Sequence, residues 1–228
     1  MIKYDWSKYN LKRDTEAISQ FKKYSKNKKR SIIIQKGLYN HIRDIYALTV
    51  LISKKTKKNL NILDYGGNLI SNISLSFKID TNKINVWVYN PFSSNLIYKK
   101  KILRYVNVIK SLKLIKKNFF SITYLGSVIQ YCKNLDSIEG REIINNCKYV
   151  LLTHTPISIT KREFYLKQIN HKNLNQKIHS LQNIKKKLLK NNYSVEFISY
   201  NDYKYTGLKK NKNILSVNIL FKKKSKII

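Results

Sequence analysis

An apolar run that ends in an acid and two glycines constrains the fold of this chain more than any other feature. The run is Asn61-Ile62-Leu63, and Asp64-Tyr65-Gly66-Gly67 follows it directly. Apolar residues at helical spacing come next, at Ile70, Ile73 and Phe77. A strand, a carboxylate, a glycine turn and a helix are typical of an α/β sheet that holds a nucleotide-like cofactor. Glycine lets the backbone adopt positive φ values and approach a ligand closely.

The rest of the chain alternates between strand-like and helical patterns, which indicates a mostly parallel sheet with helices on both faces. Helical spacing occurs at 38–52, 94–104, 136–147 and 176–190, and strand-like runs occur at 84–89, 107–112, 119–125, 149–153, 195–199 and 214–221. The last two runs have no helix between them, so we expect them to pair antiparallel. The predicted fold class is a doubly wound, Rossmann-like α/β sheet with an antiparallel C-terminal edge hairpin.

Charge and length set the expected partners and the domain organisation. Residues 1–35 are predicted to form a basic N-terminal arm, and residues 36–228 one domain. The chain has 46 Lys+Arg against 12 Asp+Glu, a formal net charge of +34. Such a surplus attracts polyanions, so nucleic acid, an anionic membrane surface and an anionic glycan are candidate partners. The alternative is a solvated lysine-rich surface without a specific partner.

The sequence shows no segment of about 20 apolar residues, the length a transmembrane helix needs, and no signal-peptide core. A cytoplasmic protein, peripheral to the inner membrane through its positive charge, is therefore expected. The two cysteines are isolated, and the acids and histidines show no metal-ligand spacing, so no metal site is predicted.

In parallel sheets, ligands bind beyond the carboxyl ends of the strands. The predicted ends lie at 64–67, 89–91, 126–131 and 154–156. We expect these four segments to converge on one cleft.

Three of these segments resemble a bacterial subfamily of class I S-adenosylmethionine-dependent methyltransferases. Its members carry Leu-Asp-Phe-Gly-Gly after the first strand, Gly-Val-Leu-Gln-Tyr after the fourth and Arg-Thr-Pro after the fifth. The matching segments here are Leu63–Gly67, Gly126–Tyr131 and His154–Pro156, and Phe164–Gln168 matches a later Phe-x-x-x-Gln element. The resemblance covers roughly residues 36 to 222. It implies a methyltransferase sheet, S-adenosylmethionine as cofactor and a role in surface-polysaccharide synthesis.

The resemblance also implies two groups of site residues. The cofactor group lies beside the methionine, ribose and adenine and comprises Asp64, Gly66, Gly67, Asn68, Tyr89, Asn90, Gly126 and Ser127. The acceptor group comprises Gln130 and Tyr131, and His171 in a polar loop is a further candidate on the substrate side. The implied acceptor is a sugar hydroxyl of a glycan or glycan precursor.

Methyl transfer to an alcohol benefits from a base whose pKa lies near neutral, and histidine fits this requirement best. His154 follows a strand-like run, where such a base would be placed, so it is the candidate catalytic residue. The alternative for His154 is packing against Pro156 or a hydrogen bond to a loop carbonyl. His41 and His179 lie in helical patterns and are expected to be surface or packing residues.

Departures from the subfamily pattern keep two other functions open. Asn68 follows the glycines where a further glycine is usual, Tyr89 or Asn90 stands where the class has an acid, and His154 replaces an arginine. These departures motivate the alternative of a catalytically degenerate scaffold. The charge, the basic residues at 22–30 and the many tyrosines among lysines motivate a nucleic-acid-binding protein or an RNA methyltransferase.

Overall fold

The computed structural model describes residues 60–67, 84–91, 107–112, 119–138, 141–168, 175–201 and 213–224. These residues divide into two compact units, one before and one after the junction of Lys110 and Ser111. The predicted basic arm and its boundary at residues 35 and 36, the helices expected at 38–52 and 94–104, and the site candidates Asn68 and His171 lie outside the described residues.

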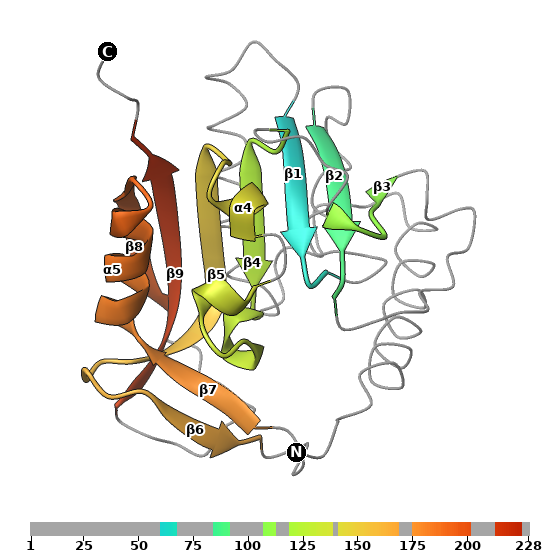
Figure 1. Ribbon diagram of the computed structural model, residues 1–228. Coiled ribbons are helices and arrows are strands. Elements are labelled where there is room, and N and C mark those ends of the chain that lie inside the picture. Colours follow the sequence, from blue (N-terminus) through green and yellow to red (C-terminus); the bar gives the residue numbers. More distant parts are fainter. Residues whose placement is uncertain are drawn as a thin grey trace, which may run out of the picture. The chain divides into compact units, whose positions relative to one another are not determined.

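The first unit contains three parallel strands, drawn in cyan and green in Figure 1. They are β1 (Leu60–Tyr65), β2 (Ile84–Tyr89) and the short β3 (Asn107–Val108). β2 pairs with both neighbours, and its pairing with β1 runs in register to Tyr65 and Tyr89. The two strands therefore end side by side, which places the residues after each of them at the same edge.

The strand predicted at 84–89 is confirmed, whereas the one predicted at 107–112 is shorter than expected. Only Asn107 and Val108 pair with β2, and the Ile109 amide then donates one further hydrogen bond to the Val88 carbonyl at 2.9 Å.

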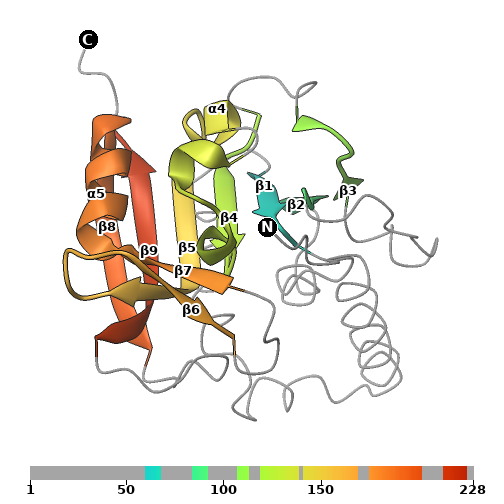
Figure 2. The ribbon, with the colours of Figure 1, turned by 60° about the horizontal axis from the view of Figure 1, so that its bottom comes forward.

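The second unit contains the other six strands of the described chain. They are β4 (Ile122–Gly126), β5 (Tyr149–Ser158), β6 (Phe164–Lys167), β7 (Asn175–Ser180), β8 (Tyr193–Asn201) and β9 (Ile214–Lys223). β5 is parallel to β4 and antiparallel to β9, and β9 is antiparallel to β8. The predicted antiparallel C-terminal hairpin is thereby confirmed. Figures 1 and 2 show these strands with helix α5 (Leu181–Lys190) packed along β8.

Buried apolar side chains from the inner strands form the core of this unit. Leu125, Val150, Leu152, Ile219 and Phe221 are all excluded from solvent. Helix α5 turns its apolar face inward through Ile184 and Leu188, one helical turn apart, as its spacing predicts. Among the described residues, no helix combines the length and the apolar character needed to cross a bilayer.

The predicted end of β5 at Thr153 is wrong, because the strand continues to Ser158. The register against β9 shifts between Leu152 and Thr155, which marks a β-bulge at His154. Proline within a sheet is found at bulges and edges, and Pro156 follows this bulge. β4 pairs with β5 only as far as Thr153, and β7 then pairs with β5 at Ile157 and Ser158.

The helix predicted over 176–190 is correct only in its second part. Residues 175–180 form β7, which pairs antiparallel with β6 and parallel with the end of β5. Asn175 is exposed and Lys177 partly exposed while Gln176 and Ile178 are fully buried, so the first four residues alternate with a period of two, as in a strand. Tertiary pairing therefore overrides the helical pattern, and His179 lies on a strand rather than on the expected helix.

The helix predicted over 136–147 is also mostly wrong. Two short pieces replace it, the 3₁₀ turn η5 (Leu135–Ser137) and the single-turn helix α4 (Arg141–Ile144). The side chains of Asn134 and Ser137 cap η5 reciprocally, which closes the turn locally.

Candidate active site

In the turn after β1, a buried carboxylate packs closely against a glycine. Asp64 is 3% exposed, and Gly66 has a φ of 77°, in the region that favours glycine. A Cβ atom on Gly67 would lie 2.4 Å from Asp64 Oδ2, closer than real contacts allow. Glycine is therefore required at residue 67 for the Asp64 carboxylate to occupy its observed position.

The end of β2 completes this turn. The Gly66 amide donates a hydrogen bond to the Tyr89 carbonyl at 2.7 Å, and Asn90 Nδ2 donates one to the Gly67 carbonyl at 3.2 Å. The Tyr89 ring is buried, with its centroid 5.5 Å from that of Tyr65. The structure thus brings together five of the predicted cofactor residues, and Asn90 holds the glycine turn through its amide.

In the second unit, Gly126 ends β4 beneath a tyrosine ring. A Cβ atom on Gly126 would lie 2.1 Å from the hydroxyl of Tyr124, which in turn accepts a hydrogen bond from Thr153 Oγ1 at 2.8 Å. The sequence interpretation missed Tyr124. The available signal was strand alternation, because residues two apart project from the same face of a strand.

Ser127 and His154 are adjacent and share an unusual backbone conformation. Their φ values are 53° and 49°, in the left-handed region that residues other than glycine seldom adopt. The Ser127 amide donates to the Thr153 carbonyl at 2.9 Å, and Ser127 Oγ donates to the His154 carbonyl at 3.1 Å. Strained conformations of this kind cluster at functional sites. The structure therefore joins two predicted site residues at the carboxyl end of β4.

Two buried residues of β9 support the bulge at His154. The His154 amide donates to Asn218 Oδ1 at 2.9 Å, and Asn218 Nδ2 donates to Ser199 Oγ at 3.1 Å. Ser216 Oγ lies 3.4 Å from His154 Nδ1. Burial lowers the pKa of His154, which keeps the imidazole neutral and able to accept a proton near neutral pH. The signal that could have found Ser216 and Asn218 is their polar character within the apolar run 214–221.

Replacing Asn218 by alanine should lower the free energy of unfolding by about 1–3 kcal/mol, because the buried His154 amide then loses its acceptor. Asn218 is 0% exposed, so water does not replace the lost oxygen without a rearrangement. Urea denaturation of Ser199→Ala is the matched control, since it removes a partner on the far side of Asn218, leaves the His154 amide with its acceptor and should cost less. Equal losses in the two variants would contradict a specific support for the bulge.

Gln130 and Tyr131 lie on the 3₁₀ turn η4 (Ile129–Tyr131), close after the end of β4. Gln130 is buried, whereas Tyr131 is partly exposed and its hydroxyl accepts a hydrogen bond from Gln176 Nε2 at 3.1 Å. In the described parts of the chain, no group of three or more His, Cys, Asp or Glu side chains is arranged to hold a metal ion.

No protein-family model matches the chain, and no curated protein matches it in sequence. Solved structures do match it. Magnesium protoporphyrin IX methyltransferase from Synechocystis PCC 6803 is 11% identical, with a TM-score of 0.50 over 84% of this chain and 88% of that one. The 1,6-didemethyltoxoflavin-N1-methyltransferase of Burkholderia thailandensis is 8% identical, with a TM-score of 0.53 over 99% of this chain and 92% of that one.

These similarities confirm the predicted fold class. The chain has the Rossmann-like α/β fold of class I S-adenosylmethionine-dependent methyltransferases, with an antiparallel C-terminal strand pair. Sequence identities this low establish only the fold, so the activity has to be argued from the residues of the site.

Proposed function

We propose that this protein is an S-adenosylmethionine-dependent methyltransferase that binds its cofactor at the turn after β1. The observation that carries the proposal is the buried Asp64 carboxylate, packed against Gly67 at the carboxyl end of β1. Ligands of such sheets bind beyond this edge. A carboxylate accepts hydrogen bonds from amines and hydroxyls, and the cofactor offers both kinds of donor.

The solved neighbours support the same cofactor class. The Synechocystis structure contains bound S-adenosylmethionine, and the Burkholderia structure contains bound 1,6-didemethyltoxoflavin and S-adenosylhomocysteine. In this chain, Asp64, Gly66 and Gly67 would hold the methionine and ribose side, with Tyr89 and Asn90 closing the turn. Asn68, Gly126 and Ser127 are the remaining residues assigned to the cofactor.

The bound cofactor would supply an electrophilic methyl group, and the protein would orient the acceptor and remove its proton. His154 is assigned as the base, because its imidazole is neutral and its backbone is fixed by Ser127 and Asn218. Gln130, Tyr131 and His171 are assigned to the acceptor side.

The proposed acceptor is a sugar hydroxyl on a glycan or a glycan precursor. The sequence resemblance to a polysaccharide-linked subfamily supports this choice, and the charge of +34 favours an anionic precursor. The same charge supports a cytoplasmic location at the anionic face of the inner membrane.

Calorimetric titration with S-adenosylmethionine tests the cofactor assignment. We expect saturable binding with a Kd below about 1 mM, and a thermal shift that grows with ligand concentration. Asp64→Asn should weaken binding, because it removes the charge that the ligand's donors contact. The control is Asp136→Asn, which neutralises an exposed carboxylate on η5 and should bind as the parent does. No heat and no thermal shift at millimolar ligand would exclude the proposed cofactor.

A further inference from the structure

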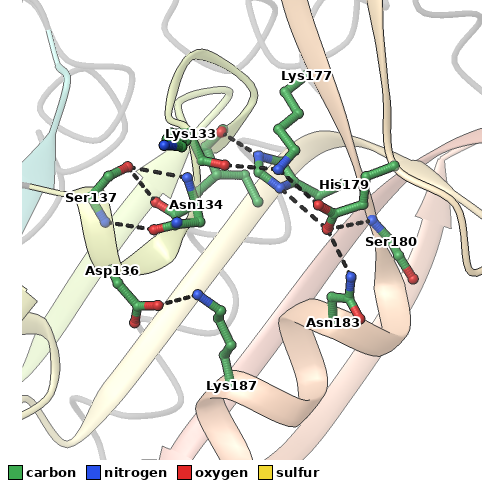
Figure 3. Close-up of polar contacts among 11 residues, drawn as sticks. Lys133, Asn134, Asp136, Ser137, Lys177, His179, Ser180, Asn183 and Lys187 are labelled. Carbon is green, nitrogen blue, oxygen red and sulfur yellow. Dashed lines mark hydrogen bonds and ion pairs between the residues drawn. The ribbon is translucent and has the colours of Figure 1, made fainter.

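Strand β7 holds the segment that follows β4 by three successive side-chain contacts. Gln176 Nε2 donates to the Tyr131 hydroxyl at 3.1 Å, Lys177 Nζ donates to the Lys133 carbonyl at 2.8 Å, and His179 Nε2 lies 2.8 Å from the Ile129 carbonyl. Figure 3 shows Lys133 and Lys177 in contact, with His179 beside them. A carbonyl only accepts hydrogen bonds, so His179 Nε2 must carry the proton.

These contacts add to a short strand pairing between the hairpin and the rest of the unit. β7 pairs with β5 at only two positions, Ile157 with His179 and Ser158 with Ser180. β6 pairs with β7 and with no other described strand. The bonds from Gln176, Lys177 and His179 therefore connect the hairpin to residues 129–133.

A single carboxylate, Glu163, organises the side chains that make this connection. Its oxygens lie 2.7 Å from Lys177 Nζ and 3.7 Å from His179 Nδ1. They also accept hydrogen bonds from Asn183 Nδ2 at 3.1 Å and from the Ser180 amide at 3.3 Å. Figure 3 shows these four partners gathered from β7 and the start of α5.

Glu163 stays ionised in this setting. Burial alone would raise the pKa of its carboxyl, but the hydrogen bonds from Lys177, Asn183 and Ser180 outweigh burial and lower the pKa to about 2. The ion pair with Lys177 is shielded, with side-chain exposures of 15% for Lys177 and 23% for Glu163. Removing one partner of a shielded pair leaves the other charge uncompensated, so Lys177 depends on Glu163 for its position.

We propose that Glu163 is a positioning residue for the acceptor side of the site, acting through Lys177 on the segment 129–133. The inference rests on the proposed function, which assigns Gln130 and Tyr131 of this segment to the acceptor. The segment follows closely after the carboxyl end of β4, the edge at which sheets of this type bind ligands. The β6–β7 hairpin thus fixes the wall against which an acceptor would be oriented.

Amide hydrogen exchange in Glu163→Gln tests the proposal in the full-length protein. The Tyr131 and Cys132 amides bond to the Val128 and Ile129 carbonyls at 2.9 Å and 3.0 Å, so they report directly on η4. We expect roughly tenfold faster exchange across 129–133 when the charge is lost, and an unchanged rate in β9. Lys177→Gln should give the same local increase in exchange rate, and it is the variant to use if Glu163→Gln folds poorly.

Asp136→Asn is the matched control for this experiment. Asp136 also pairs with a lysine, Lys187, but that pair is exposed, with side-chain exposures of 36% for the lysine and 52% for the acid. Exposed pairs contribute little to stability, so exchange across 129–133 should match the parent in this variant. An unchanged exchange rate in both Glu163→Gln and Lys177→Gln would overturn the proposal.

Kinetics separate positioning from a general loss of structure. With a panel of nucleotide-linked hexoses as acceptors, Glu163→Gln should raise the acceptor KM roughly tenfold and leave the Kd for S-adenosylmethionine within about twofold. An equal loss of cofactor affinity would overturn local positioning. A parent protein that transfers no methyl group to any probe would contradict the proposed function instead, and the exchange rates would still decide whether Glu163 holds the segment.

Discussion

Gly67→Ala should both weaken cofactor binding and destabilise the fold. The new Cβ atom would lie 2.4 Å from Asp64 Oδ2 and 2.5 Å from Asp64 Cγ, so the buried carboxylate must move. Overpacking of this kind costs about 1–3 kcal/mol of unfolding free energy. Displacing the carboxylate should weaken S-adenosylmethionine binding roughly 10- to 100-fold, which is the effect expected when a charge-assisted hydrogen bond is lost. Urea denaturation and calorimetric titration measure the two effects.

The double variant Asp64→Ala/Gly67→Ala separates stability from binding. Truncating Asp64 removes the atoms that the new Cβ atom would meet, so the free energy of unfolding should recover relative to Gly67→Ala alone. Cofactor affinity should stay low, because the carboxylate is absent. Recovery of binding in the double variant would show that Asp64 does not contact the cofactor.

His154→Asn should lower the rate of methyl transfer about 10²- to 10⁴-fold, the usual contribution of a general base. Asparagine tolerates the left-handed φ of 49° found at this residue, and its backbone amide can still donate to Asn218. Stability and the Kd for S-adenosylmethionine should therefore change little. His154→Val is the structural control, since a β-branched residue at this φ should destabilise the protein by about 1–3 kcal/mol.

The pH dependence gives a second test of the same role. A base acts in its neutral form, and burial lowers the pKa of His154 from its ordinary value of 6.5. The rate should therefore stay constant as the pH falls through 6.5 and decline only at a lower pH. His154→Asn should lack this decline in its residual activity. A parent profile that falls at or above pH 6.5 would assign the base to another group.

The local patterns predicted most strands of this chain but misplaced several boundaries. Strand β2 was predicted at its true bounds, β8 was predicted two residues short at each end, and β9 was predicted two residues short at its C-terminal end. The errors arose where pairing partners decide the conformation. β5 continues through Pro156 because β9 and β7 pair with its second half. Residues 175–180 form a strand because they pair with β6 and with the end of β5.

In the candidate site, too, local features could be predicted from sequence and long-range contacts could not. Asp64, Gly66 and Gly67 could be found from sequence, because a carboxylate and a glycine turn are contiguous and their geometry is local. Asn218 and Ser216 could not be paired with His154 from sequence, because they lie 64 and 62 residues away from it along the chain. Glu163 was missed because its partners are not its neighbours in sequence: they lie on the later strand β7 and on helix α5.

The sequence alone determined the α/β class, the glycine turn after β1 and the antiparallel C-terminal strands, because each depends on short-range periodicity and on the backbone freedom of glycine. Only the tertiary structure decided that β5 bulges at His154, that β9 supports this bulge, and that Glu163 ties β7 to the segment after β4. These features depend on contacts between residues far apart in sequence. Strand pairing, rather than local preference, sets the register of a sheet and the direction in which its side chains point.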